Sequence, residues 1–291
     1  MDDKITLIME LRQLKAHFEQ QLSPLYDSEE ARRFFELLLE AFEHKKRIDL
    51  VLTPDITTPQ PERWHAALEA LHRFVPIQYI MGSTYFYDLP FEVTPATLIP
   101  RPETEELVAW ILHDFPNTNG TLLDIGTGSG CIPIAIAKNC PQASVTAIDV
   151  AADALAVAQR NAQRNGVQVK FIQENALDAP AMEVRFTQKF FDCIVSNPPY
   201  VRKLEKHEIQ PNVLEHEPHL ALFVDDEDAL LFYRHIGQFA LSHLKKGGKL
   251  YFEINQYLGA ETQQLMEQLG FSTVILRKDL FGNDRMLRCE R

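Results

Sequence analysis

The sequence predicts an α/β protein in which helices cover both faces of a mostly parallel β-sheet, preceded by a small all-helical domain and a linking β-hairpin. Apolar residues recur at helical spacing over residues 1–75, and β-forming residues with turn signals follow over residues 76–100. Beyond residue 120, short apolar runs alternate with helical segments, as they do in α/β sheets. We therefore expect three parts, of which the last, residues 101–291, forms the sheet domain.

The first part has the periodicity of a helical bundle. Its two amphipathic stripes are Ile5, Leu7, Ile8, Leu11, Leu14 and Phe18, and then Phe34, Leu37, Leu38, Ala41 and Phe42. A third helix is expected over residues 62–74, with Pro61 in its first turn, where the missing amide hydrogen of proline costs no hydrogen bond. Such a bundle could act as a stabilising cap or as a docking surface, and its sequence favours neither.

Residues 76–100 change to β-forming character. The β-formers are Tyr79, Ile80, Tyr85, Phe86, Phe91 and Val93, and the turn signals are Gly82-Ser83 and Asp88-Leu89-Pro90. A hairpin that links the two domains is the simplest interpretation. A helix is expected to begin within residues 100–106, because the acidic residues there favour the positive end of a helix dipole.

The sheet domain is expected to contain seven strands. They are predicted at residues 122–125, 144–148, 169–172, 190–195, 249–254, 273–276 and 286–289. The main helices between them are predicted at residues 132–137, 152–165, 228–244 and 261–269. Gly166 follows the second of these helices and suits the left-handed conformation that ends many helices.

Composition limits the classes of function. The formal net charge is −12 and the sequence contains no basic block, which argues against a protein that grips bare nucleic acid. The four cysteines lie far apart and include no C-x-x-C pair, so we expect reduced thiols in a cytoplasmic protein and no metal site. We recognise no signal peptide and no apolar run long enough to span a membrane.

A glycine-rich loop follows the first strand of the sheet domain. It consists of Gly126, Thr127, Gly128, Ser129 and Gly130, and Asp149 ends the next strand. Glycines let the backbone approach a ligand, and an acidic residue at the end of the next strand can bind ribose hydroxyls. A dinucleotide site would need a glycine at the sixth position of the loop, where this chain has Cys131. The alternative for Asp149 is that it caps the following helix.

The loop therefore suits a nucleoside ligand that has no pyrophosphate. Asp124, just before the loop, adds a negative charge that could face an ammonium group, although a purely structural role is equally compatible with its position. S-adenosylmethionine carries an ammonium group, a sulfonium and ribose hydroxyls, and it has no phosphate. We expect this molecule as the cofactor.

A second motif follows the fourth predicted strand. It is Asn197-Pro198-Pro199-Tyr200, named here the NPPY motif. The prolines keep their carbonyl acceptors, the Asn197 side chain offers another oxygen, and Tyr200 offers an aromatic face. Two acceptors and a flat wall suit a planar NH2 group conjugated to a carbonyl or a ring. The alternative is a proline-rich turn that only ends a strand.

Together, the glycine-rich loop, Asp149 and the NPPY motif resemble the class I S-adenosylmethionine-dependent methyltransferases that methylate planar amino groups and have a Rossmann-like, seven-stranded, mostly parallel sheet. Within this class the chain is similar to the HemK/PrmC family, the N5-glutamine methyltransferases of bacterial peptide chain release factors. Residues 79–82, 91–93, 98–105 and 279–285 also resemble this family. The resemblance covers about residues 76–291, whereas residues 1–75 match only in length and helical character.

The resemblance implies a substrate, a cofactor and a partner. The substrate would be the glutamine of the Gly-Gly-Gln motif in class 1 peptide chain release factors, and the N-terminal helical domain would help to hold these proteins. S-adenosyl-L-methionine would bind at the glycine-rich loop, Asp149, Asn175, Ala176 and Asn197, and S-adenosyl-L-homocysteine would be the product. Ala176 departs from the aromatic residue that often stacks on adenine in this family.

The NPPY motif would then hold the glutamine amide. Asn197, Pro198 and Tyr200 are the expected catalytic residues, and Pro199 and Arg101 are expected to contact the substrate as well. Arg101 could instead pair with nearby acidic residues. After Glu217-Pro218, glycines that are common in the family are replaced by Asp225, Asp226 and Ala229.

Two other functions stay open at this stage. Enzymes that methylate adenine N6 or cytosine N4 share the Asn-Pro-Pro-aromatic motif, but they must also hold a nucleic acid strand, which the acidic charge disfavours. The other is a non-catalytic scaffold that binds S-adenosylmethionine.

His207, His216 and His219 share one loop and are expected to be solvated rather than to bind metal. We expect a monomer without direct contacts to nucleic acid or membrane.

Overall fold

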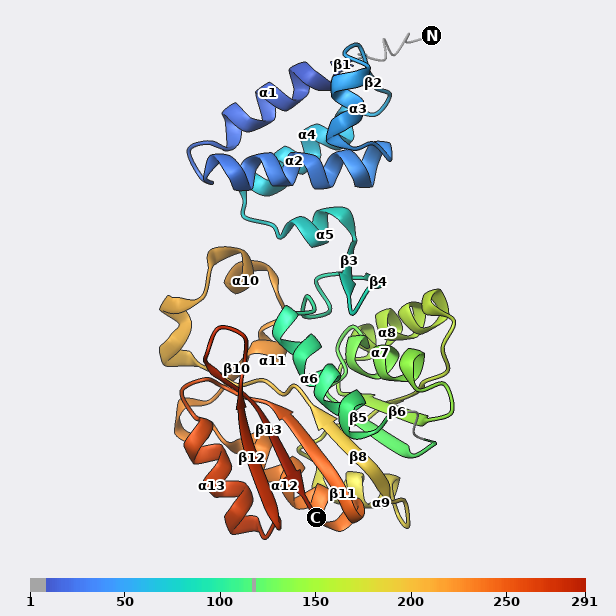
Figure 1. The fold of residues 1–291 in the computed structure, drawn as a ribbon. Helices are drawn as coiled ribbons and strands as arrows, with labels where there is room; N and C mark the ends of the chain where they lie inside the picture. The colour runs from blue at the N-terminus through green and yellow to red at the C-terminus, as the bar shows by residue number, and fades with distance from the viewer. Residues whose placement is uncertain (1–8, 117–118) are drawn as a thin grey trace. The chain divides into compact units, whose positions relative to one another are not determined.

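A computed structural model of the chain describes residues 9–116 and 119–291, which fall into two compact units (Figure 1). The helical unit ends at Gly82 and also takes in Pro211–His216, and the sheet unit comprises Ser83–Gln210 and Glu217–Arg291. The predicted apolar positions Ile5, Leu7 and Ile8 lie outside the described residues.

The helical unit is built around a buried aromatic cluster. Its elements before Gly82 are β1 (Met9–Glu10), α1 (Leu11–Leu22), α2 (Ser28–Glu43), α3 (Arg47–Leu52), β2 (Thr57–Thr58), α4 (Pro61–His72) and α5 (Ile77–Met81). Pro61 is the first residue of α4, as predicted. The fully buried Trp64 of α4 stacks on Phe35 with ring centroids 4.9 Å apart, and Phe18 and Phe42 meet it edge-on. These rings account for much of the apolar surface that holds the helices together.

Residues 77–81 correct one prediction. Tyr79 and Ile80 were expected in a strand, but they belong to helix α5, which Gly82 ends in the left-handed conformation at φ 69°. Ile77 is buried in the core of the helical unit, and this packing outweighs the β-propensity of the segment. The hairpin begins later, with β3 (Ser83–Phe86) paired to β4 (Leu89–Glu92).

The sheet unit contains one seven-stranded sheet, which confirms the predicted mostly parallel architecture. Its strand order is β12-β13-β11-β8-β5-β6-β7, and the bounds are β5 (Thr121–Ile125), β6 (Ser144–Asp149), β7 (Lys170–Gln173), β8 (Phe191–Ser196), β11 (Leu244–Glu253), β12 (Thr273–Lys278) and β13 (Asp284–Glu290). The five strands from β11 to β7 run parallel, and β13 runs antiparallel to both of its neighbours.

Helices cover both faces of this sheet (Figure 1). One group is α6 (Pro102–Asp114), α7 (Cys131–Asn139) and α8 (Ala152–Asn165), and the other is α9 (Ala179–Arg185), α12 (Leu231–His243) and α13 (Gly259–Leu269). Successive strand residues alternate between two cores: Leu122 belongs to the first core and Leu123 to the second, and Tyr251 and Phe252 divide in the same way. Apolar residues on both sides of a strand are typical of a sheet buried on two faces.

The segment between β8 and α12 is made of short elements. They are β9 (Val201–Arg202), the 3-10 helix η1 (Lys203–Glu208), α10 (Pro211–His216), α11 (His219–Leu222), β10 (Phe223–Val224) and the 3-10 helix η2 (Asp226–Asp228). Strands β9 and β10 pair in parallel. Over residues 9–116 and 119–291, none of the helices combines the length and the apolar character needed to cross a bilayer.

Candidate active site

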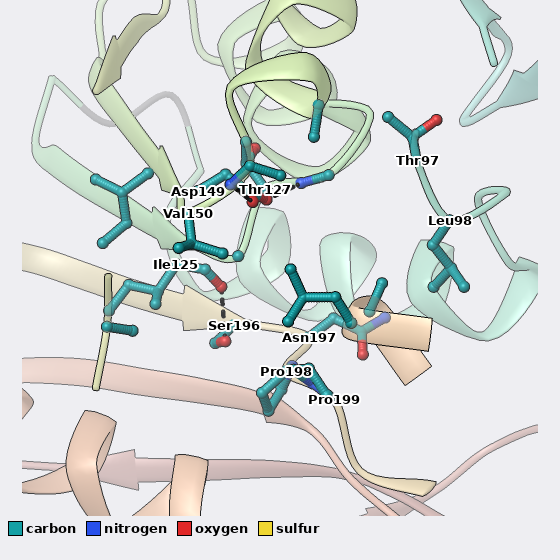
Figure 2. A pocket seen from close by; sticks show the side chains of 18 of the residues that line it. Thr97, Leu98, Ile125, Thr127, Asp149, Val150, Ser196, Asn197, Pro198 and Pro199 are labelled. Carbon is teal, nitrogen blue, oxygen red and sulfur yellow. Dashed lines mark hydrogen bonds between the residues drawn. The ribbon is translucent and has the colours of Figure 1, made fainter. Parts of the chain in front are cut away.

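A cavity of about 280 Å³ lies at the carboxyl edge of the sheet, where the loops after β5, β6, β7 and β8 meet (Figure 2). The chain extends from β5 through β6 to β7 on one side and returns to β8 on the other, and α/β sheets bind ligands at such a reversal. The cavity brings together most of the predicted site residues: Arg101, Gly126, Thr127, Gly128, Ser129, Asp149, Asn175, Ala176, Asn197, Pro198 and Pro199.

The glycine-rich loop turns tightly between β5 and α7. Gly126 and Gly128 line the cavity at φ 78° and 53°, values that side chains disfavour. Gly130 does not line the cavity, because it faces the neighbouring helix instead. A Cβ atom on Gly130 would lie 2.9 Å from Ile134 Cδ1 and 3.0 Å from Ala158 Cβ. The absence of a side chain at this position therefore permits the close packing of α7 and α8.

Asp149 ties the glycine-rich loop to the end of β6. Its Oδ2 accepts a hydrogen bond from Gly128 N at 2.8 Å, and its Oδ1 accepts one from Ala151 N at 2.9 Å, at the start of α8. Burial raises the pKa of Asp149, and these backbone donors oppose the shift. A carboxylate has about four acceptor positions, so further positions remain for a ligand. Asp149 is thus both a support for the loop and a charged group in the cavity wall.

The NPPY motif begins where β8 ends. The hydroxyl of Ser196 donates to Ile125 O at 2.7 Å, which links the ends of β8 and β5 (Figure 2). Asn197 Nδ2 donates to Thr104 Oγ1 over a long 3.4 Å. Asn197, Pro198 and Pro199 all line the cavity, opposite the glycine-rich loop.

Tyr200 takes a different position from the aromatic wall that we predicted. It is not among the residues that line the cavity, and it packs against the core on the second face of the sheet. Its hydroxyl donates to Glu253 Oε1 at 2.9 Å, and its carbonyl accepts from Asn255 Nδ2 at 2.9 Å. The structure therefore ties Tyr200 to Glu253 and Asn255, outside the cavity lining.

The loop after β7 contributes Asn175 and Ala176, with Leu177 beside them. The side chain of Asn175 turns back on the chain, where its Oδ1 accepts from Leu177 N at 3.0 Å. Apolar side chains surround this end of the cavity, and Ile148, Val150, Leu177 and Phe232 are among them. Sequence reasoning missed these residues because apolar positions in strands and helices give the same pattern whether they face a core or a ligand.

Arg101 lies in the cavity wall and pairs with an acidic residue, which was one of the two roles considered for it. It lines the cavity, and its Nη2 forms an ion pair with Glu217 Oε1 at 2.6 Å. Glu217 is only 3% exposed and its other oxygen accepts from Ile99 N at 3.1 Å. The ion pair therefore joins the start of α6 to the segment after α10 and holds the guanidinium at the cavity edge.

Asp124 is fully buried and lies outside the cavity lining. It has 0% exposure, and neither of its carboxylate oxygens has a hydrogen-bond partner in the part of the chain that the structure describes. Burial raises the pKa of Asp124 to about 7. The ionised form of this side chain is therefore unfavourable in the folded protein.

Replacing Asp124 by asparagine is expected to remove a pH-dependent loss of stability. Because the folded pKa of Asp124 lies above its unfolded value of 3.8, the folded state binds more protons between about pH 4 and 7, and its stability falls as the pH rises through this range. The free energy of unfolding of the variant relative to the native chain should thus increase from pH 4 to 7 and level off above. Urea denaturation at a series of pH values measures this difference.

Asp192→Asn is the matched control with the opposite sign. Although burial opposes it, hydrogen bonds from Lys245 and Thr121 lower the pKa of Asp192. Its stabilising contribution is therefore present above the unfolded pKa and is lost as the pH falls. If the difference in the free energy of unfolding between Asp124→Asn and the native chain does not change with pH, the raised pKa of Asp124 would be contradicted.

The histidines of the loop after the NPPY motif have local contacts. His207 Nδ1 lies 3.0 Å from Leu204 O, and the ring of His219 meets that of Phe223 edge-on. His216, within the helical unit, has Nε2 at 2.6 Å from Arg73 O. Among residues 9–116 and 119–291, no group of three or more histidine, cysteine or acidic side chains is arranged to hold a metal ion.

Comparisons with known proteins cover both units. The family model for the PrmC N-terminal domain matches residues 13–82, and that for the methyltransferase small domain matches residues 105–220. The chain is 51% identical to the release factor glutamine methyltransferase of Flavobacterium psychrophilum, over 96% of this chain and 99% of that one. It is 40% identical to the protein of the same name from Bacteroides thetaiotaomicron, over 97% of this chain and all of that one. A methyltransferase from Pyrococcus furiosus shares the fold, with a TM-score of 0.51 at 20% identity, over 78% of this chain and 96% of that one.

Proposed function

The chain belongs to the family of release factor glutamine methyltransferases, which depend on S-adenosylmethionine, and we propose that it methylates the side-chain amide nitrogen (N5) of the glutamine in the Gly-Gly-Gln motif of class 1 peptide chain release factors. One observation carries this proposal. A single cavity is lined both by the glycine-rich loop with Asp149 and by the first three residues of the NPPY motif. A nucleoside cofactor and a planar amide can therefore meet within it.

The glycine-rich side of the cavity fits the cofactor. Thr127 and Gly128 offer backbone contacts, and Asp149 offers acceptors for ribose hydroxyls. The apolar residues near Leu177 suit the adenine ring and would replace the stacking contact that Ala176 cannot make. When bound, S-adenosylmethionine supplies an electrophilic methyl group on its sulfonium. The residues of this side would fix the position from which that methyl group is transferred.

The NPPY side of the cavity fits the glutamine amide. An amide nitrogen is a weak nucleophile, because its lone pair is shared with the carbonyl. Hydrogen bonds from the substrate NH2 group to Asn197 Oδ1 and Pro198 O would aim the nitrogen and stabilise the positive charge that develops on it. Alignment of this kind contributes up to about 7–11 kcal/mol in favourable cases. No base is required before attack, because the proton can leave to water afterwards.

The helical unit and Arg101 belong to the substrate side of the proposal. Arg101 lines the cavity, and we propose that its guanidinium contacts the protein loop that brings the glutamine in. Residues 13–82 match the PrmC N-terminal domain, and we assign to the helical unit a role in holding the release factor. None of its described residues lines the cavity, so we assign it no part in the chemical step. All four cysteines are buried and unbridged, which supports a cytoplasmic location for the enzyme. We propose that it acts as a monomer.

Deleting residues 1–82, the N-terminal part of the helical unit, is expected to raise the KM for intact release factor by about tenfold or more, as the loss of a central binding surface does. The shortened chain should start at Ser83, because Ile77 and the rest of α5 pack in the helical core. Affinity for S-adenosylmethionine should persist. A short Gly-Gly-Gln peptide, which lacks the rest of the release factor surface, should be methylated with an unchanged KM. An unchanged KM for intact release factor would leave the helical unit as a stabilising cap.

The substrate class is tested by a labelled-methyl assay. Release factor, release factor in which the glutamine is replaced by alanine, DNA and ribosomal RNA are offered side by side with labelled S-adenosylmethionine. We expect label on the first of these alone. Label on either nucleic acid would favour an adenine or cytosine amino methyltransferase, and equal label on the two release factors would contradict methylation of that glutamine.

A further inference from the structure

The carboxyl end of β11 places a buried acidic side chain behind the NPPY motif. Glu253 is 1% exposed and does not line the cavity. We infer, on the basis of the proposed function, that Glu253 acts through Thr104 to set the orientation of the Asn197 side-chain amide. Glu253 would then be a positioning residue for methyl transfer, although it touches neither the cofactor nor the glutamine.

The hydroxyl of Thr104 determines which way the Asn197 amide faces. This hydroxyl has one proton, and it donates that proton to Glu253 Oε2 at 2.6 Å, a short distance typical of a hydroxyl bound to a carboxylate. Toward Asn197 it can therefore only accept. The Asn197 amide must offer its NH2 group to Thr104, and its Oδ1 is left for the opposite, substrate-facing side.

The orientation of this amide matters for the reaction. With Oδ1 toward the substrate, Asn197 accepts a hydrogen from the glutamine NH2 group. After a flip of 180°, two NH2 groups would face each other and the acceptor would be lost. The 3.4 Å distance between Asn197 and Thr104 is long, and such hydrogen bonds commonly tighten when the substrate binds.

Glu253 also holds the other end of the motif. Its Oε1 accepts from the Tyr200 hydroxyl at 2.9 Å, so one carboxylate anchors Asn197 through Thr104 and Tyr200 directly. Burial raises the pKa of Glu253, and the hydrogen bonds from Thr104 and Tyr200 oppose this shift and offset part of the cost of burying the carboxylate. A role of Glu253 in stability alone would not require that one donor belong to the NPPY motif and that the other bind its asparagine.

The two hydrogen bonds that connect Glu253 to Thr104 and Thr104 to Asn197 form a relay. Two isosteric substitutions break this relay in different places. Thr104→Val removes the hydroxyl, and Glu253→Gln replaces one carboxylate oxygen by an NH2 group that can reverse the direction of the hydrogen bond. We expect each substitution to lower kcat for release factor methylation by about 10- to 100-fold. This loss is smaller than the one expected when a group that touches the reacting atoms is removed. The KM for release factor and the affinity for S-adenosylmethionine should stay close to the native values.

Three comparisons distinguish a role of Thr104 and Glu253 in positioning Asn197 from a role in stability alone. Thr104→Ser, which keeps the hydroxyl, should recover most of the lost kcat. Thr262→Val is the matched control, because Thr262 is equally buried and its hydroxyl donates to Leu258 O at 2.7 Å, away from the cavity. It should lower stability and leave kcat unchanged. The double variant of Thr104→Val and Glu253→Gln should be no slower than the worse single variant, because both act through one relay.

Several outcomes would overturn the inference. A native kcat in Thr104→Val would contradict it. So would a double variant in which the two separate losses of kcat multiply. If Glu253→Gln fails to fold, Thr104→Val alone is enough for the test. If the native enzyme leaves release factor unlabelled, the proposed function fails, and the relay is read instead from the side-chain NH2 signal of Asn197 in a nitrogen-15 spectrum. That signal should move in Thr104→Val and stay in Thr104→Ser. A signal that does not move in Thr104→Val would exclude the relay independently of activity.

Discussion

Replacing Asn197 by alanine is expected to lower kcat for release factor methylation by about 100- to 1000-fold, the range found when one preorganised polar group is removed from an active site. Asn197 supplies the only side-chain oxygen among the cavity-lining residues of the NPPY motif, and Pro198 can contribute its carbonyl alone. Without the side chain, the glutamine NH2 group keeps one acceptor and can rotate away from the methyl group. Steady-state kinetics with intact release factor measures the loss.

The affinity for S-adenosylmethionine separates this role from a loss of the cofactor site. Calorimetric titration should show binding largely retained in Asn197→Ala, because the glycine-rich loop and Asp149 are untouched. Asn139→Ala is a suitable control, since its amide donates to Ala135 O at 2.9 Å at the exposed end of α7, outside the cavity. An Asn197→Ala enzyme that methylates at the native rate would remove the NPPY motif from the mechanism.

The parts of the site that could be predicted from sequence are those that follow from local pattern. A strand, a glycine-rich loop and a helix are specified by residues within about a dozen positions of each other, because periodicity and turn chemistry act over that distance. Asp149 ends β6 and Asn197 directly follows β8, so the sequence places both at the carboxyl edge of a parallel sheet. Their convergence on one cavity follows from strand order.

The supporting groups could not be predicted, because they reach the site from distant parts of the chain. Thr104 and Glu253 are 149 positions apart, and Arg101 and Glu217 are 116 apart. No local pattern distinguishes a glutamate at a strand end that faces inward from one that faces solvent. The direction of Tyr200 was misjudged for the same reason, since its partner Glu253 is 53 positions away.

Asp149→Ala is expected to weaken S-adenosylmethionine binding by about 1.5–3 kcal/mol, the contribution typical of hydrogen bonds to a charged group. This corresponds to a roughly 10- to 150-fold higher Kd. Two effects add here. The carboxylate offers acceptors to the ribose hydroxyls, and it holds Gly128 N at 2.8 Å, so its loss also loosens the loop that lines the cavity. Calorimetric titration of the folded variant gives the change in Kd.

Asp178→Ala is the control that distinguishes a loss of cofactor contacts from a loss of helix capping. Asp178 is the N-cap residue of α9 and its carboxylate accepts from Ala181 N at 3.1 Å, whereas Asp149 accepts from the backbone N of Ala151, the N-cap residue of α8. Asp178 lies outside the cavity. Asp178→Ala should lose about 1 kcal/mol of stability from the missing cap, and Asp149→Ala should lose a similar amount from its missing backbone hydrogen bonds. Only Asp149→Ala should lose affinity for the cofactor. Equal, unchanged affinities in the two variants would mean that Asp149 only holds the backbone ahead of α8 and that the ribose hydroxyls bind elsewhere.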